Sequence, residues 1–191
     1  MGCADPQGDF DAFTERYASI HGTTTTSTEP GTCAPPEAGA IDGDHLLTLS
    51  VNLNPKKPVV FIAGVTTTAM GDGLGLSMTL QALAAADRTT LVGDVTTVGP
   101  YEVGADGAFV AELPELTVPA EANAITGSQI KAKVTLTGTL CADALACGKV
   151  TGTAVVNVDG SDFTLQKIDD PAAYPEAVIN CAGETAPLAE E

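Results

Sequence analysis

The feature that most constrains this chain is an alternation of apolar and polar residues that begins at about Asp44. In residues 47–53 every second residue is leucine or valine, and in residues 74–80 every second residue is leucine or methionine. Successive side chains of a β-strand point to opposite faces, so this period of two predicts strands with one apolar face. An α-helix would instead require apolar residues three and four positions apart.

Similar patterns predict further strands, and the segments between them carry the Gly, Asp, Asn and Pro residues of tight turns. Residues 59–63 are apolar at every position, which indicates a strand that is covered on both faces. We therefore predict a mainly β fold, an antiparallel meander of about eight strands that forms a barrel or a sandwich. The other predicted strands are residues 89–97, 108–113, 130–140, 149–158 and 163–168.

One segment has the period of a helix instead. Phe10, Phe13, Tyr17 and Ile20 recur at spacings of three, four and three, which places them on one face of a helix at residues 9–21. We expect this face to pack on the β core. The alternative, a helix lying on a membrane, is disfavoured because its polar face is acidic.

These patterns organise the chain as a short leader followed by one domain. Residues 1–8 form a polar leader, or tether, and residues 9–191 form the domain. Within the domain we expect the helix at 9–21, a linker at 22–43, the β core at 44–168 and a polar, Pro- and Ala-rich tail at 169–191.

The charge of the chain excludes one class of partner. It has 25 acidic residues against eight basic ones, for a net charge of −17. Such a surface repels phosphate, so we expect no nucleic-acid partner. We interpret the acidity as a strongly hydrated surface, with a cation-binding surface as the alternative.

The five cysteines indicate an oxidising compartment. With Cys3 set aside, Cys33, Cys141, Cys147 and Cys181 make an even set, which predicts two disulfides. Cys141 and Cys147 flank a short loop between two predicted strands, and directly opposed positions of a hairpin can be bridged. We therefore predict the pairs Cys141–Cys147 and Cys33–Cys181. The alternative is that Cys141 or Cys147 pairs with a distant cysteine.

The remaining cysteine lies at the start of the chain, directly after Gly2. This Gly2-Cys3 pair resembles the end of a bacterial lipobox, where the signal peptide is removed and the cysteine is acylated. The resemblance implies a mature bacterial lipoprotein, with a signal peptide ending just before Cys3 and a lipid on Cys3. It also implies an exported protein, anchored to a membrane in the periplasm or on the cell surface. The alternatives are dual acylation at Gly2 and Cys3, which Pro6 disfavours, and an unpaired cysteine without a role.

No motif for catalysis or for a cofactor stands out. Residues 71–75 imitate a glycine-rich phosphate loop, but a strand follows where a true phosphate loop opens a helix. The Asp and Gly residues at 42–44 and 159–162 are interpreted as turns, with fragments of calcium loops as the alternative. His21 and His45 are the only histidines, and no G-x-S-x-G motif is present. We therefore predict no enzyme activity, no cofactor and no metal site.

Two functions remain after these exclusions. The first is binding of a small apolar ligand in a barrel or between sheets, with Val59, Phe61, Leu76 and Met78 as its lining. The same side chains could simply fill a core. The second is a structural or protein-interaction module on the cell envelope, without a ligand cavity. An apolar chamber of at least a few hundred Å³ would distinguish the first function from the second.

Overall fold

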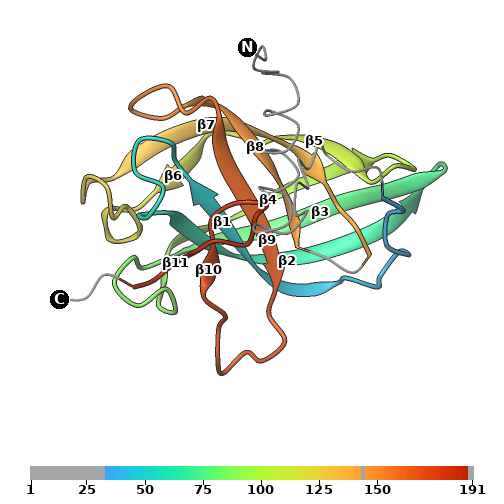
Figure 1. The fold of residues 1–191 in the computed structure, drawn as a ribbon, viewed down its shortest axis with the longest axis horizontal. Helices are drawn as coiled ribbons and strands as arrows, with labels where there is room; N and C mark the ends of the chain where they lie inside the picture. The colour runs from blue at the N-terminus through green and yellow to red at the C-terminus, as the bar shows by residue number, and fades with distance from the viewer. Residues whose placement is uncertain (1–32, 143–144, 189–191) are drawn as a thin grey trace, which may run out of the picture.

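A computed structural model describes residues 33–142 and 145–188 of the chain (Figure 1). Within these residues the fold is almost entirely antiparallel β, with one 3₁₀ turn, η1 (Ala120–Ala122). The predicted helix at residues 9–21 lies outside the described residues. The long strands are β1 (Gly43–Ser50), β2 (Val59–Met70), β3 (Gly73–Leu83), β4 (Leu91–Val103), β5 (Ala108–Glu112), β7 (Ile130–Thr139), β8 (Ala146–Thr153) and β9 (Ser161–Lys167), and the short strands are β6 (Leu116–Val118), β10 (Ala177–Val178) and β11 (Thr185–Ala186).

Eight of these strands close into a barrel. Each of the first four strands pairs with the next one along the chain, β7 pairs with β8, and β8 pairs with β9. Two pairings close the ring: β9 returns to β1, and β5 pairs with β7. The short strand β6 lies along the same edge of β7 as β5 does. The predicted antiparallel meander is thus confirmed, and it forms a barrel rather than a sandwich.

The barrel interior is filled by the apolar residues of the period-two pattern. On β1 these are Leu47 and Leu49, and on β3 they are Leu74, Leu76 and Met78, all at most 9% exposed. Leucine, valine and alanine supply most of the core because the chain has no tryptophan. Two phenylalanines, Phe109 and Phe163, meet edge to face with ring centroids 5.9 Å apart.

A pair of glycines makes room for this aromatic contact. Gly138 of β7 and Gly148 of β8 are directly paired in the sheet. A Cβ atom on Gly138 would lie 2.7 Å from the Phe163 ring, and one on Gly148 would lie 2.8 Å from it. The barrel wall can therefore accept no side chain at either position.

The C-terminal tail covers one outer face of the barrel. Leu46, Val60 and Ile168 face outward and are buried together with Ala177 of the tail. Thr164 of β9 donates a hydrogen bond from its hydroxyl to the carbonyl oxygen of Val178 at 2.6 Å. In Figure 1 the small β10–β11 sheet lies across β1 and β9. We call the outward side of β1, β2 and β9 the covered face.

The cysteine pairing predicted from the sequence is wrong. The two disulfides join Cys33 to Cys141 and Cys147 to Cys181. The register of the β7–β8 hairpin explains the difference, because Cys147 lies opposite Thr139 rather than opposite Cys141. Cys147 therefore bonds to the C-terminal tail on the outer face, and Cys141 fastens Cys33 near the β4–β5 turn, where Cys33 N–H donates to Asp106 O at 3.1 Å.

No helix among the described residues is long and apolar enough to cross a membrane. The two disulfides are typical of a compartment outside the reducing cytoplasm.

Candidate binding site

The four residues predicted to line a ligand lie together in the barrel core. Val59, Phe61, Leu76 and Met78 are at most 5% exposed and belong to one packed cluster. Val59 borders a cavity whose volume is about 50 Å³. That space is about the size of one or two water molecules, and the placement of these side chains agrees with the core-filling alternative. Ligand binding itself stays a prediction.

A much larger apolar depression lies on the outside of the barrel, over β5, β7 and β8. Its volume is about 700 Å³. Ala108 and Val110 of β5 and Thr137 of β7 point outward into it, and Val110 is 54% exposed. We call this depression the outer groove. It is lined by Glu102, Gly104, Ala108, Phe109, Val110, Thr137, Gly138, Thr139, Cys147, Gly148, Lys149 and Cys181.

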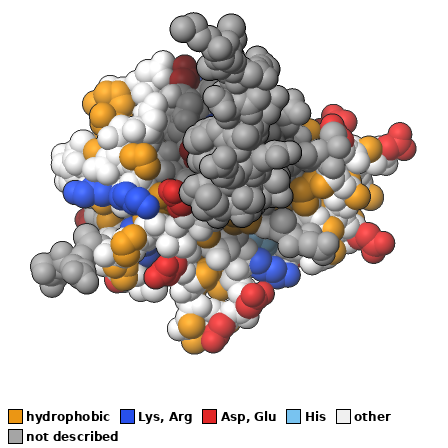
Figure 2. Space-filling model, in the orientation of Figure 1, with side chains coloured by type: hydrophobic (Ala, Val, Ile, Leu, Met, Phe, Trp, Pro, Cys, Tyr) orange, Lys and Arg blue, Asp and Glu red, His pale blue; other side chains and the backbone are white. Residues whose placement is uncertain are grey.

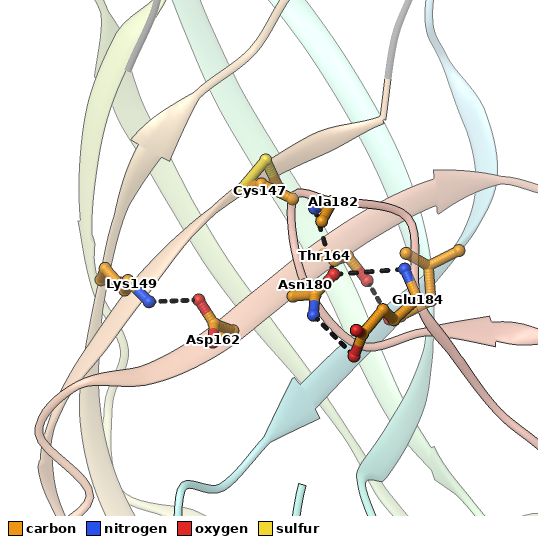
Figure 3. The surroundings of a disulfide bond; sticks show 9 residues. Cys147, Lys149, Asp162, Thr164, Asn180, Ala182 and Glu184 are labelled. Atoms are coloured by element: carbon orange, nitrogen blue, oxygen red, sulfur yellow. Dashed lines mark hydrogen bonds and ion pairs between the residues drawn. A yellow bond between two sulfur atoms is a disulfide. The ribbon is translucent and has the colours of Figure 1, made fainter. Parts of the chain in front are cut away.

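One wall of the outer groove is fixed by covalent and polar contacts. The Cys147–Cys181 disulfide joins β8 to the tail, as Figure 3 shows. Next to it the Asn180 side-chain oxygen accepts hydrogen bonds from the backbone N–H groups of Ala182 and Glu184 at 3.0 and 3.2 Å. These contacts hold Cys181 in a tight turn. The wall is therefore a preformed feature of the described fold.

The charges at the outer groove are few and lie at its rim. Lys149 of β8 forms an ion pair with Asp162 of β9 at 2.6 Å. Glu102 of β4 is exposed. Between Lys149 and Glu102 the groove is lined mainly by methyl groups, glycine backbone and a disulfide. The groove therefore suits an apolar occupant.

A second depression, of about 460 Å³, lies at one end of the barrel and contains the only described histidine. His45 is 4% exposed, and its Nδ1 donates to the carbonyl oxygen of Gly43 at 3.1 Å in the tautomer that this contact favours. Burial lowers the pKa of His45, and the nearby Lys167 lowers it further. The imidazole is therefore neutral at pH 7. No nucleophile or second base is hydrogen-bonded to it among the described residues.

Of the aspartates at residues 42–44 and 159–162, Asp159 lies in a turn as predicted and Asp42 directly precedes β1, whereas Asp44 and Asp162 belong to β1 and β9. The Asp42 carboxylate accepts hydrogen bonds from Thr67 N–H and from the Thr67 hydroxyl, both at 2.8 Å. The Asp159 carboxylate accepts one from Gly152 N–H at 2.8 Å, which lowers the pKa of Asp159. On the face shown in Figure 2 the acidic side chains are scattered. Among residues 33–142 and 145–188 no cluster of three metal-ligating side chains is present.

The other residues singled out in the sequence are placed as follows. The glycine-rich residues 71–75 form the turn from β2 to β3 and the start of β3, with Gly71 in the left-handed region at a φ of 57°. Cys3 and His21 lie outside the described residues. Comparison with protein-family models, with curated proteins and with solved structures finds no match to this chain.

Sequence reasoning missed the outer groove. Val110 lies between Phe109 and Ala111 in an apolar run, so the sequence does not show which of these residues face outward. The structure shows that Phe109 and Ala111 are buried and Val110 is exposed. The groove also needs the tail beside β8, and that contact depends on a disulfide between residues 34 positions apart. The one available signal was the apolar stretch of residues 108–111, which has no polar outward position.

Proposed function

We propose that this protein is a non-enzymatic envelope lipoprotein whose barrel serves as a rigid structural or interaction module. The observation that carries the proposal is the packed interior. The predicted ligand lining lies in the core, and the cavity that it borders, beside Val59, holds about 50 Å³. A barrel that carries an apolar ligand inside needs a volume of a few hundred Å³.

The disulfides support the proposed role as a rigid module. Cys33–Cys141 closes a loop of 108 residues, and Cys147–Cys181 closes one of 34 residues. Cross-links of this kind restrict the unfolded chain and keep a small exported domain folded without cellular assistance. The acidic surface, with a net charge of −17, keeps such a domain hydrated.

A second candidate function is binding of an apolar ligand at the outside of the barrel. The outer groove, with its volume of about 700 Å³ and its apolar lining, favours it. Extraction of the protein purified from its own membranes, followed by mass spectrometry of the organic phase, distinguishes the two functions. A stoichiometric lipid that is not attached to Cys3 would favour the ligand carrier, whereas its absence is expected for the structural module.

The anchor is tested by the substitution Cys3→Ser in a protein expressed with a lipoprotein signal peptide. Two or three acyl chains hold a protein firmly at a membrane, and the negative charge of this chain adds no affinity for anionic lipids. We therefore expect the unchanged protein to sediment with membranes and the Ser variant to become soluble, with the same melting temperature. Sedimentation of both forms would contradict the lipid anchor.

A further inference from the structure

The outer groove has no cover among the described residues, although the covered face of the same barrel is overlaid by the tail. Val110 is 54% exposed in the groove, whereas the outward Val60 of the covered face is 2% exposed. An apolar depression of this size on the surface of an acidic protein is typical of a binding site. The chain itself supplies a segment of suitable chemistry.

The point at which the described chain begins lies beside the groove. Cys33 is bonded to Cys141, two residues after Thr139 of the groove lining. A Cβ on Gly107 would lie 2.9 Å from the Cys33 sulfur, and Gly107 directly precedes Ala108 of the groove. The described chain therefore begins, at Cys33, beside one end of the outer groove.

The length of the preceding chain is sufficient to reach along the groove. Residues 22–32 can span up to about 36 Å when extended. A helix of residues 9–21 would be about 20 Å long. The segment can therefore lie over β5, β7 and β8 without strain in the connection.

The chemistry of the segment matches that of the groove. Residues 9–21 carry three acidic residues and one arginine, besides the apolar stripe of Phe10, Phe13, Tyr17 and Ile20. Among the residues that line the groove, the one cation is Lys149, which is paired with Asp162, and the one carboxylate is Glu102. The match is therefore mainly apolar, between the stripe of residues 9–21 and the apolar lining of the groove.

We propose that the outer groove is the docking site for residues 9–21 of the same chain, which bind as a helix through the stripe of Phe10, Phe13, Tyr17 and Ile20. The tail and the N-terminal segment then cover neighbouring parts of the barrel wall. The proposal does not depend on a lipid at Cys3, because the tether that brings the segment to the groove is Cys33–Cys141.

Photo-cross-linking of the full chain tests the proposal directly. Phe13 is replaced by p-benzoylphenylalanine, and the control carries the same group at Ser19, which lies on the opposite side of a helix at 100° per residue. After irradiation we expect position 13 to form a cross-link within one chain, to peptides that contain residues 104–110, 137–139 or 147–149. The control is expected to give little of this product.

Two variants probe the groove from its own side. Val110→Asp places a charge under the apolar stripe and should reduce the yield of the cross-link at least about fivefold. Val95→Asp is the matched control, because Val95 is also exposed, at 60%, and lies seven residues along β4 from Glu102 of the groove. Circular dichroism checks that both variants keep the barrel.

Three results would overturn the proposal. A cross-link between two chains would assign the groove to a second copy. A cross-link to other strands, or one that Val110→Asp leaves unchanged, would place the segment elsewhere. The third test is binding of the apolar dye Nile red. Docking predicts that the dye binds a Phe13→Asp variant more strongly than it binds the unchanged chain. Equal binding to both would show that the groove is open to an apolar ligand.

Discussion

The covered face and the outer groove both carry outward apolar residues, but only the covered face has a covering segment among the described residues. On the covered face, outward Leu46 and Val60 are buried by the tail, which is held by the Cys147–Cys181 disulfide. At the groove, outward Val110 has no cover among residues 33–142 and 145–188. The difference shows that closing a barrel decides only what lies inside it, while outward apolar residues need a separate covering segment.

The ends of the tail show how such a cover is fastened. Lys56 donates to the carbonyl oxygen of Thr185 at 3.3 Å, and Arg88 donates to those of Ala186 and Pro187. These contacts are made mostly to backbone carbonyls, so they depend little on which residues the tail contains. A segment of ordinary composition can therefore serve as a cover, provided that a few apolar side chains and one cross-link fix its position.

The largest effects are expected from removal of the disulfides. The chain-entropy relation gives at most about 5 kcal/mol for the loop of 108 residues and about 4 kcal/mol for the loop of 34 residues. We therefore expect the Cys33→Ala/Cys141→Ala protein to be less stable in urea than the Cys147→Ala/Cys181→Ala protein.

The two double variants should also differ in which part of the protein shows faster hydrogen exchange. Loss of Cys147–Cys181 should increase hydrogen exchange at Val178 and Ile179 of the tail, because its cover then opens without unfolding of the barrel. Unchanged exchange at these residues would show that the apolar and polar contacts of the tail hold the cover without the disulfide.

A matched pair of valines compares the two faces at the level of one side chain. Threonine keeps the shape and the β-branching of valine but adds a hydroxyl. Val60→Thr buries that hydroxyl beneath the tail and should lower the free energy of unfolding by about 2 kcal/mol. Val110→Thr places the hydroxyl in the outer groove. An open groove predicts a loss of about 0.5 kcal/mol, whereas a groove covered by residues 9–21 predicts a loss close to that of Val60→Thr, and urea unfolding of both variants distinguishes the two.

The sequence predicted most barrel strands because burial of one face enforces a period-two pattern. The largely exposed β4 lacks this pattern and extends to Val103, beyond the predicted residues 89–97. Residues 59–63, apolar at every position, correctly indicated a strand buried on both faces. The identity of the cover could not be predicted. Its buried apolar residues Ala177, Ile179 and Ala186 belong to a short apolar run and a single alanine in a Pro- and Ala-rich tail, which show no long period-two pattern.

The disulfide pairing was predicted wrongly and the outer groove was not predicted, for a related reason. A one- or two-residue difference in hairpin register decides whether Cys141 faces Cys147, and the length of a turn does not fix that register. The outer groove similarly depends on which strands become neighbours when β5 closes on β7. Long-range pairing is the information that local patterns lack.

The last comparison concerns two threonines that lie side by side beneath the tail. Thr48 of β1 and Thr164 of β9 are directly paired, and both are at most 1% exposed. The Thr164 hydroxyl donates to Val178 O, whereas the buried Thr48 hydroxyl has no hydrogen-bond partner among the described residues. Thr164→Val would leave the carbonyl of Val178 without that donor and should cost about 1–2 kcal/mol.

Thr48→Val, by contrast, removes only an unpartnered hydroxyl, so it should leave stability unchanged or raise it by up to about 1 kcal/mol. Urea unfolding of both variants measures the difference, which should have opposite signs for two residues that are indistinguishable in the sequence pattern. If both substitutions destabilised the protein equally, the Thr48 hydroxyl would have a partner beneath the tail, and the covered face would be held by more polar contacts than the Thr164 bond alone.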